Sequence, residues 1–150
     1  MFLRISGRPE ASGAGKFTVL MFPAELPGGE KAMATKILTV DDDSGTRGFY
    51  KFVLESAGFI VETAVDAASA VTACEAFNPD MLLLDWDMPG GGGKVVMEKI
   101  WKLLDKKIPV LFITGLPDKV DVDLLAGRIS VLTKPVNIDT LLTHVDCLLK

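Results

Sequence analysis

Cysteine is scarce in this sequence, and long apolar runs are missing. Cys74 and Cys147 are the only cysteines and have no metal-type spacing, which favours two thiols in a reducing cytosol. No apolar run approaches the roughly 18 residues that a membrane span requires. A formal charge of −4 disfavours a nucleic-acid surface, because such a surface needs a basic face. We therefore expect a cytoplasmic protein that binds neither membranes nor nucleic acid.

The composition predicts one folded domain preceded by an extension. Hydrophobic residues make up 49% and charged residues 24%, and 150 residues provide room for a single complete core. Residues 1–34 are different, because glycine and proline are frequent and no helical or strand period persists. We expect this segment to be a disordered extension or, if Met33 is the natural start, an artefact of the assigned start site. The predicted domain is residues 35–150.

Polar side chains follow four short apolar runs. The run Met81-Leu-Leu-Leu-Asp85 ends in a carboxylate and has the pattern of a buried strand in a parallel sheet. The other runs and the polar residues after them are Lys36–Val40 with Asp41-Asp42-Asp43, Ile108–Ile113 with Thr114, and Ile129–Thr133 with Lys134. Open α/β sheets bind ligands at the carboxyl ends of their strands, so we expect these polar groups to meet.

Helical patterns alternate with the predicted strands. Five strands and five helices predict an α/β fold with a doubly wound parallel sheet. Ser44 is the predicted N-cap of the first helix, and a weaker helix is predicted around residues 118–126. The glycine run Gly90–Gly93 predicts a mobile loop before the third helix.

The polar groups at the strand ends indicate phosphoryl chemistry with a divalent cation. The adjacent carboxylates Asp41 and Asp42 repel each other unless a hard cation such as Mg²⁺ lies between them. Asp85 is a candidate nucleophile, since carboxylates form acyl phosphates. The ammonium group of Lys134 and the hydroxyl group of Thr114 are suited to hold phosphoryl oxygens.

Four sequence elements resemble the signature set of receiver domains of two-component response regulators. They are Ile37-Leu-Thr-Val-Asp-Asp-Asp43, Leu82-Leu-Leu-Asp85-Trp-Asp-Met-Pro89, Phe112-Ile-Thr114-Gly115 and Thr133-Lys134-Pro135. The resemblance covers about residues 36–150, with all four elements in order. It implies a flavodoxin-like (βα)5 fold with strand order 2-1-3-4-5, and a cis peptide bond between Lys134 and Pro135.

The resemblance also implies a metal site. Asp42 and Asp85 would bind Mg²⁺ directly, and the backbone carbonyl of Asp87 would be a third protein ligand. Asp41 would act through a metal-bound water.

The implied reaction is phosphorylation of Asp85 by a histidine kinase, a phosphotransfer protein or a small donor such as acetyl phosphate. Thr114 would be the switch hydroxyl, and Lys134 would hold the phosphoryl group. Hydrolysis would reset the protein, so we expect a bacterial phosphoprotein that catalyses only its own phosphorylation and dephosphorylation.

The sequence departs from the receiver pattern at two places near the site. Gly90–Gly93 replace a stretch that usually carries a hydrophobic residue and Asp-Gly. Val131 stands where receivers usually have a tyrosine or phenylalanine that rotates inward when the switch threonine moves. The connection from Thr114 to Lys134 is also slightly short.

Three functions are weighed from the sequence. The chain ends after its last predicted helix, which favours a stand-alone switch, monomeric or weakly dimeric, with an unidentified protein target. Asp85-Trp-Asp87 also matches the Asp-x-Asp motif of haloacid-dehalogenase-type phosphatases, but the order of elements along the chain is reversed. Val131 and the glycine run keep open a receiver-like scaffold that binds partners without phosphorylation.

Overall fold

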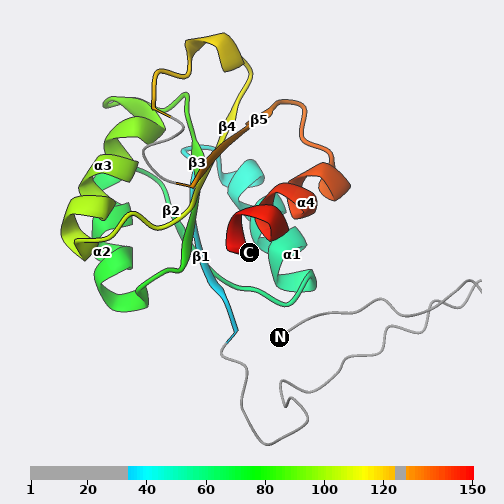
Figure 1. The fold of residues 1–150 in the computed structure, drawn as a ribbon, viewed down its shortest axis with the longest axis horizontal. Coiled ribbons are helices and arrows are strands. Elements are labelled where there is room, and N and C mark those ends of the chain that lie inside the picture. The colour runs from blue at the N-terminus through cyan, green and yellow to red at the C-terminus, as the bar shows by residue number, and fades with distance from the viewer. Residues whose placement is uncertain (1–33, 124–127) are drawn as a thin grey trace, which may run out of the picture.

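A computed structural model describes residues 34–123 and 128–150 of the protein, which form a five-stranded parallel sheet flanked by helices (Figure 1). The strands are β1 (Lys36–Val40), β2 (Ile60–Ala64), β3 (Met81–Asp85), β4 (Val110–Thr114) and β5 (Ile129–Thr133). The helices are α1 (Ser44–Ser56), α2 (Ala67–Phe77), α3 (Gly92–Leu104), the 3-10 helix η1 (Pro117–Lys119) and α4 (Ile138–Leu149). The strand order β2-β1-β3-β4-β5 confirms the predicted topology.

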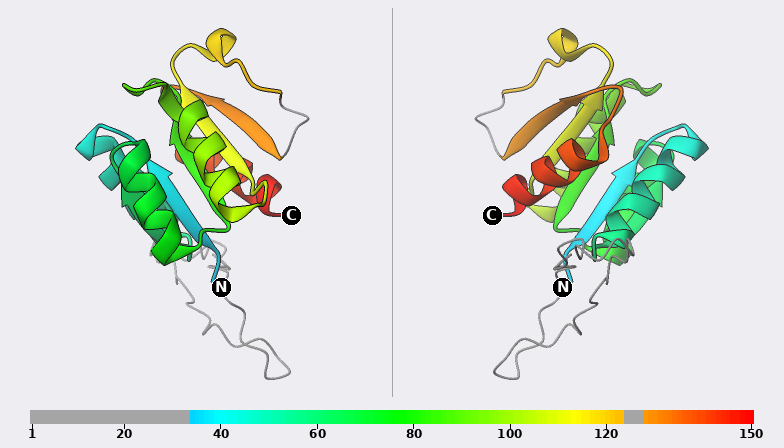
Figure 2. Two further views of the ribbon diagram at one scale, coloured as in Figure 1. Left: turned by 90° about the vertical axis from the view of Figure 1, so that its left-hand side faces the viewer. Right: turned by 90° about the vertical axis from the view of Figure 1, so that its right-hand side faces the viewer.

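The sheet is buried on both faces because helices cover each of them. Figure 2 shows α2 and α3 on one face and α1 and α4 on the other. Side chains alternate along each strand, so Leu82 and Leu84 of β3 pack toward α2 and α3, whereas Met81 and Leu83 pack toward α1 and α4. All five residues of β3 are buried, and so are all five of β4. This double burial explains the continuous apolar runs in the sequence.

Side-chain caps begin α1, α2 and α4, and the cap of α1 corrects one prediction. Asp43, not Ser44, is the N-cap of α1, because its carboxylate accepts a hydrogen bond from the backbone N–H of Thr46 at 2.8 Å. Ser44 is the first residue of the helix. A carboxylate accepts this bond more strongly than a hydroxyl and also favours the positive end of the helix dipole.

The connection between β4 and β5 differs from the expected helix around residues 118–126. Its described part holds only the single 3-10 turn η1, and residues 120–123 form no helix. Residues 124–127 lie outside the described residues. Within the described ranges the domain therefore has four α-helices rather than five.

Two further expectations concern other parts of the chain. The predicted extension, residues 1–34, lies almost wholly outside the described residues, so its disorder and the start at Met33 stay predictions. Among the described helices, none is long and apolar enough to cross a membrane.

Removal of the hydroxyl group of Thr39 should stabilise the fold. Thr39 is fully buried in β1, and its Oγ1 has no hydrogen-bond partner among the described residues. Because an unpaired buried hydroxyl costs free energy, Thr39→Val should raise the free energy of unfolding by about 1 kcal/mol, as measured by urea denaturation. Thr39→Ala, which leaves a cavity, is the control and should lower it. A less stable valine variant would show that the hydroxyl has a buried partner such as a water molecule.

Candidate functional site

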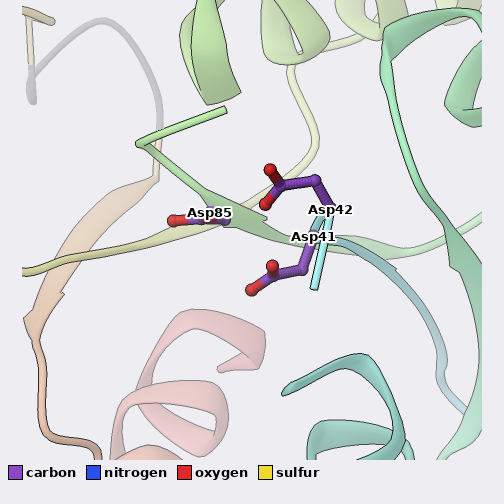
Figure 3. A group of neighbouring side chains, drawn as sticks. All are labelled: Asp41, Asp42 and Asp85. Atoms are coloured by element: carbon purple, nitrogen blue, oxygen red, sulfur yellow. The ribbon is translucent and has the colours of Figure 1, made fainter. Parts of the chain in front are cut away.

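Acidic side chains from two neighbouring strands meet at the carboxyl edge of the sheet. Asp41 and Asp42 directly follow β1, Asp85 is the last residue of β3, and these two strands pair in parallel. One carboxylate oxygen from each of the three residues lies within 4.8 Å of the others (Figure 3). The sequence prediction that these groups come together is therefore confirmed.

Asp41 is the most perturbed member of this acidic cluster. The residue is 2% exposed. Oδ1 accepts a hydrogen bond from the backbone N–H of Asp43 at 2.9 Å, whereas Oδ2 is buried without a partner among the described residues. The pKa of Asp41 is raised to about 6, mainly by burial; the hydrogen bond from the Asp43 amide opposes this shift, and the negative charge of Asp85 adds to it. The cluster is thus short of positive charge.

The three carboxylates fit a hard divalent cation. Mg²⁺ takes oxygen ligands, commonly one or two carboxylates, and keeps several waters. Asp42 is exposed at the edge of the cluster while Asp41 and Asp85 are buried, so the group opens to solvent on one side. The unpartnered Oδ2 of Asp41 is the kind of atom that a cation or its water shell would satisfy.

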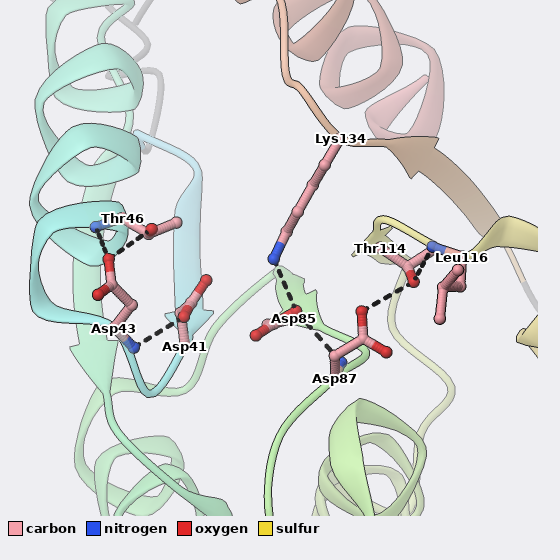
Figure 4. Close-up of polar contacts among 8 residues, drawn as sticks. All are labelled: Asp41, Asp43, Thr46, Asp85, Asp87, Thr114, Leu116 and Lys134. Atoms are coloured by element: carbon pink, nitrogen blue, oxygen red, sulfur yellow. Dashed lines mark hydrogen bonds and ion pairs between the residues drawn. The ribbon is translucent and has the colours of Figure 1, made fainter.

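Asp85 is also approached from β5. Lys134, which follows β5, places its Nζ 3.3 Å from Asp85 Oδ1 (Figure 4). The backbone N–H of Asp87 donates to the same oxygen at 3.2 Å. Asp85 therefore has an ammonium group on one side and the carboxylates of Asp41 and Asp42 on the other. The peptide bond between Lys134 and Pro135 is cis, as the resemblance implied.

Thr114 lies in the same region and contacts Asp87 and Leu116. Its hydroxyl donates to Oδ2 of Asp87 at 3.0 Å, and its Oγ1 accepts from the backbone N–H of Leu116 at 3.0 Å. The sequence singled out Asp87 for its backbone carbonyl and for the Asp85-Trp-Asp87 motif. It did not predict the contact between the Asp87 side chain and Thr114, because the two residues are 27 positions apart.

A cleft of about 370 Å³ lies beside Lys134, between α1 and the segment that follows β5. Asp43, Thr46, Phe49, Tyr50 and Val136 are among its lining residues. Burial raises the pKa of Tyr50, and the negative charges of Asp41 and Asp85 raise it further. The phenol therefore lies within electrostatic range of the acidic cluster. Tyr50 is buried, whereas Phe49 and Phe52 of the same helix are exposed.

The glycine run is only partly a loop. Gly92 and Gly93 are buried and form the first turn of α3, so the loop prediction is wrong for them. Gly92 has φ +70°, and a Cβ there would lie 2.2 Å from the carbonyl oxygen of Trp86; a Cβ on Gly93 would lie 2.7 Å from that of Asp85. These glycines let α3 pack directly against the backbone that carries Asp85.

Val131 stands where the receiver pattern usually has a tyrosine or phenylalanine, so this position carries no aromatic ring. It is half-buried in β5, pairs with Phe112 of β4 and packs against the α2–α3 side of the core. The nearby aromatic pair is Trp86 and Phe112, whose ring centroids are 5.0 Å apart in an edge-to-face arrangement. Val131 itself has no hydrogen-bonding side chain to offer Thr114.

Comparisons with known proteins agree with this fold and identify its family. Residues 37–146 match the response regulator receiver domain family. The chain is 32% identical over 121 residues to the phosphate regulon transcriptional regulatory protein PhoB of Klebsiella pneumoniae, covering 79% of this chain and 53% of that protein. It is 32% identical over 120 residues to the DNA-binding response regulator MtrA of Mycobacterium leprae, covering 79% and 52%. The chain thus spans about half the length of these relatives.

A solved structure gives the same result. The chemotaxis protein CheY4 of Vibrio cholerae superposes with a TM-score of 0.67 at 27% identity, covering 77% of this chain and 99% of that one. The chain therefore belongs to the receiver-domain family of two-component response regulators. Receiver domains are phosphorylated on aspartate, bind Mg²⁺ at an acidic pocket, interact with histidine kinases or phosphotransfer proteins, and are signalling proteins rather than classical enzymes.

The close approach of α3 to the site predicts different responses at two glycines with similar backbone angles. Gly92→Ala should lower the free energy of unfolding by about 2–4 kcal/mol, because its Cβ would meet the Trp86 carbonyl. Gly90→Ala is the matched control: Gly90 has φ +82° with nothing within 4 Å of a Cβ, so the loss should be about 1 kcal/mol. Thermal denaturation of both variants measures the difference, and equal losses would contradict the packing argument.

The buried charge of Asp41 predicts a pH-dependent stability in the absence of divalent cations. Its pKa is raised from 3.8 to about 6 in the folded protein, so the folded state holds this proton more tightly than the unfolded state. The associated stability is fully present below about pH 4 and is lost as the pH rises through 6. At neutral pH, Asp41→Asn should therefore stabilise the metal-free protein by about 1–2 kcal/mol and flatten this pH dependence.

Mg²⁺ provides the control for the Asp41 substitution. The cation should stabilise the wild type more than Asp41→Asn, since it binds the folded state through the complete acidic cluster. Urea denaturation between pH 4 and 8, with EDTA or millimolar Mg²⁺, measures both effects. A variant less stable than wild type at neutral pH without Mg²⁺ would refute the argument that the buried charge of Asp41 destabilises the metal-free protein.

Proposed function

We propose that Asp85 is the phosphoacceptor of this receiver and that its phosphorylation switches the binding of a protein partner. The observation that supports this most directly is the position of Asp85. Its carboxylate ends the buried central strand β3, pairs with Lys134 at 3.3 Å, and lies within the cluster formed with Asp41 and Asp42.

In the proposed reaction an oxygen of Asp85 attacks phosphorus while the bond from phosphorus to its donor atom breaks. The electron pair of that bond leaves with the donor, a phosphohistidine of a histidine kinase or phosphotransfer protein, or acetyl phosphate. Lys134 and the backbone N–H of Asp87 both donate hydrogen bonds to Oδ1 of Asp85. Attack of one anion on another needs this local positive charge.

The proposed Mg²⁺ ligands are Asp42, Asp85 and the backbone carbonyl of Asp87, with Asp41 acting through water. When bound, the ion neutralises phosphoryl oxygens and orients them for displacement. Lys134 then balances charge from the β5 side. The hydroxyl group of Thr114 donates to a phosphoryl oxygen once its hydrogen bond to Asp87 is broken. Hydrolysis of the aspartyl phosphate returns the receiver to its resting state. In this proposal the protein catalyses no reaction other than its own phosphorylation and dephosphorylation.

The proposed partners are proteins. PhoB is named a transcriptional regulator and MtrA a DNA-binding response regulator, but this chain matches only 53% and 52% of those proteins. The formal charge of −4 supports our proposal that this chain binds no nucleic acid. Its action as a stand-alone protein, its localisation in the cytoplasm and its oligomeric state stay predictions.

Intact mass after incubation with Mg²⁺ and acetyl phosphate tests the phosphoacceptor directly. A single phosphoryl adduct should appear in the wild type, should require Mg²⁺, and should be absent from Asp85→Asn. Trp86 is half-buried next to Asp85, so its fluorescence should change when Mg²⁺ or beryllofluoride binds. Asp85→Asn should retain the fold, as judged by circular dichroism.

The opposite result would favour the scaffold hypothesis. No adduct and no fluorescence change with Mg²⁺ and beryllofluoride would refute phosphorylation at this site. An adduct that persists in Asp85→Asn would place the phosphoacceptor elsewhere.

A further inference from the structure

The hydroxyl group of Thr114 is already occupied in the resting receiver. Thr114 is fully buried at the end of β4, and its Oγ1 accepts the Leu116 N–H at 3.0 Å. The Leu116 amide can only donate, so the single hydroxyl proton is free for one acceptor. That acceptor is Oδ2 of Asp87, at 3.0 Å (Figure 4).

We propose that the carboxylate of Asp87 is a latch that holds the Thr114 hydroxyl away from Asp85 and must release it when Asp85 is phosphorylated. This inference rests on the proposed function, because the phosphoryl group is the rival acceptor. Asp87 is a positioning residue in this role, acting on the reaction through Thr114.

Competition for one proton makes the latch a switch. A hydroxyl group donates one hydrogen bond at a time, so Thr114 cannot hold Asp87 and a phosphoryl oxygen together. The bond to a carboxylate is charge-assisted and stronger than one between neutral groups. Recruitment of Thr114 by the phosphoryl group therefore costs the bond to Asp87, and this cost lowers the apparent affinity of the site for a phosphoryl group.

Phosphorylation also acts on Asp87 through charge. The backbone N–H of Asp87 donates to Asp85 Oδ1 at 3.2 Å, so Asp87 is tied to the phosphoacceptor through its own backbone. A phosphoryl group on Asp85 adds negative charge close to the Asp87 carboxylate and repels it. The phosphoryl group thus offers Thr114 a new acceptor and weakens the old one.

The neighbouring side chains described below do not compete with Thr114 for the Asp87 carboxylate. No ion pair within residues 34–123 and 128–150 includes Asp87, and Lys134 is paired with Asp85. Val131 on the neighbouring strand cannot hydrogen-bond through its side chain. The Asp87 side chain is exposed, so it can swing into solvent without leaving a cavity.

A double-mutant cycle tests the contact in the unphosphorylated, metal-free protein. The variants are Asp87→Ala, Thr114→Val and the double variant, with urea denaturation as the readout. We expect a coupling of roughly fivefold in the unfolding equilibrium constant. Effects that add without coupling would overturn the latch.

Beryllofluoride binding with Mg²⁺, followed through Trp86 fluorescence, tests the competition. Asp87→Ala should tighten beryllofluoride binding about fivefold in the wild-type background and clearly less in Thr114→Val, where no hydroxyl is released and only the repulsion by the Asp87 charge is removed. Asp87→Asn keeps an acceptor oxygen without the charge and should give an intermediate value.

Two outcomes separate this inference from the proposed function. If the wild type binds beryllofluoride but Asp87→Ala tightens binding equally in both backgrounds, the charge of Asp87 acts without Thr114 and the latch alone is overturned. If the wild type gives neither beryllofluoride binding nor a phosphoryl adduct, the proposed function and the latch are both overturned.

Discussion

Repulsion among three carboxylates is the constraint on which the site depends. Parallel pairing of β1 and β3 brings Asp41, Asp42 and Asp85 to one edge of the sheet, with one oxygen from each within 4.8 Å of the others. The apolar core on both faces of the sheet holds the strands in this register, so the acids cannot move apart. Burial of Asp41 adds to the cost and raises its pKa to about 6. Stability is thus given up where a cation is needed, which is common at functional sites.

The remaining polar groups divide the work around Asp85. Lys134 lowers the cost of its negative charge from the side of β5, while the backbone of Asp87 holds the same oxygen. Thr114 stands one contact further away, bonded to the Asp87 side chain. Hydrogen bonds therefore link Lys134, Asp85, Asp87, Thr114 and Leu116 in a chain, and under the proposed function a phosphoryl group on Asp85 would displace one of them.

The glycine run shows how a composition rule is overridden by packing. Four consecutive glycines predict conformational freedom, because glycine loses the most backbone entropy on folding. Gly92 and Gly93 instead allow α3 to lie against the carbonyl groups of Trp86 and Asp85, at distances that no Cβ tolerates. Between β4 and β5 the opposite occurs, because a predicted helix does not form. Pro117 begins a single 3-10 turn, and no helix continues through residues 120–123.

The sequence by itself determined the sheet, its strand order through the family resemblance, and the meeting of the acids with Lys134. These follow from apolar runs ending in polar residues, because the carboxyl ends of parallel strands share one edge. Only the tertiary structure decided which partner each polar atom takes. The bond from Thr114 to Asp87, the buried phenol of Tyr50 and the contact of Gly92 with Trp86 join different elements of the fold. Such contacts depend on distances of a few tenths of an ångström, which hydrophobic periodicity does not encode.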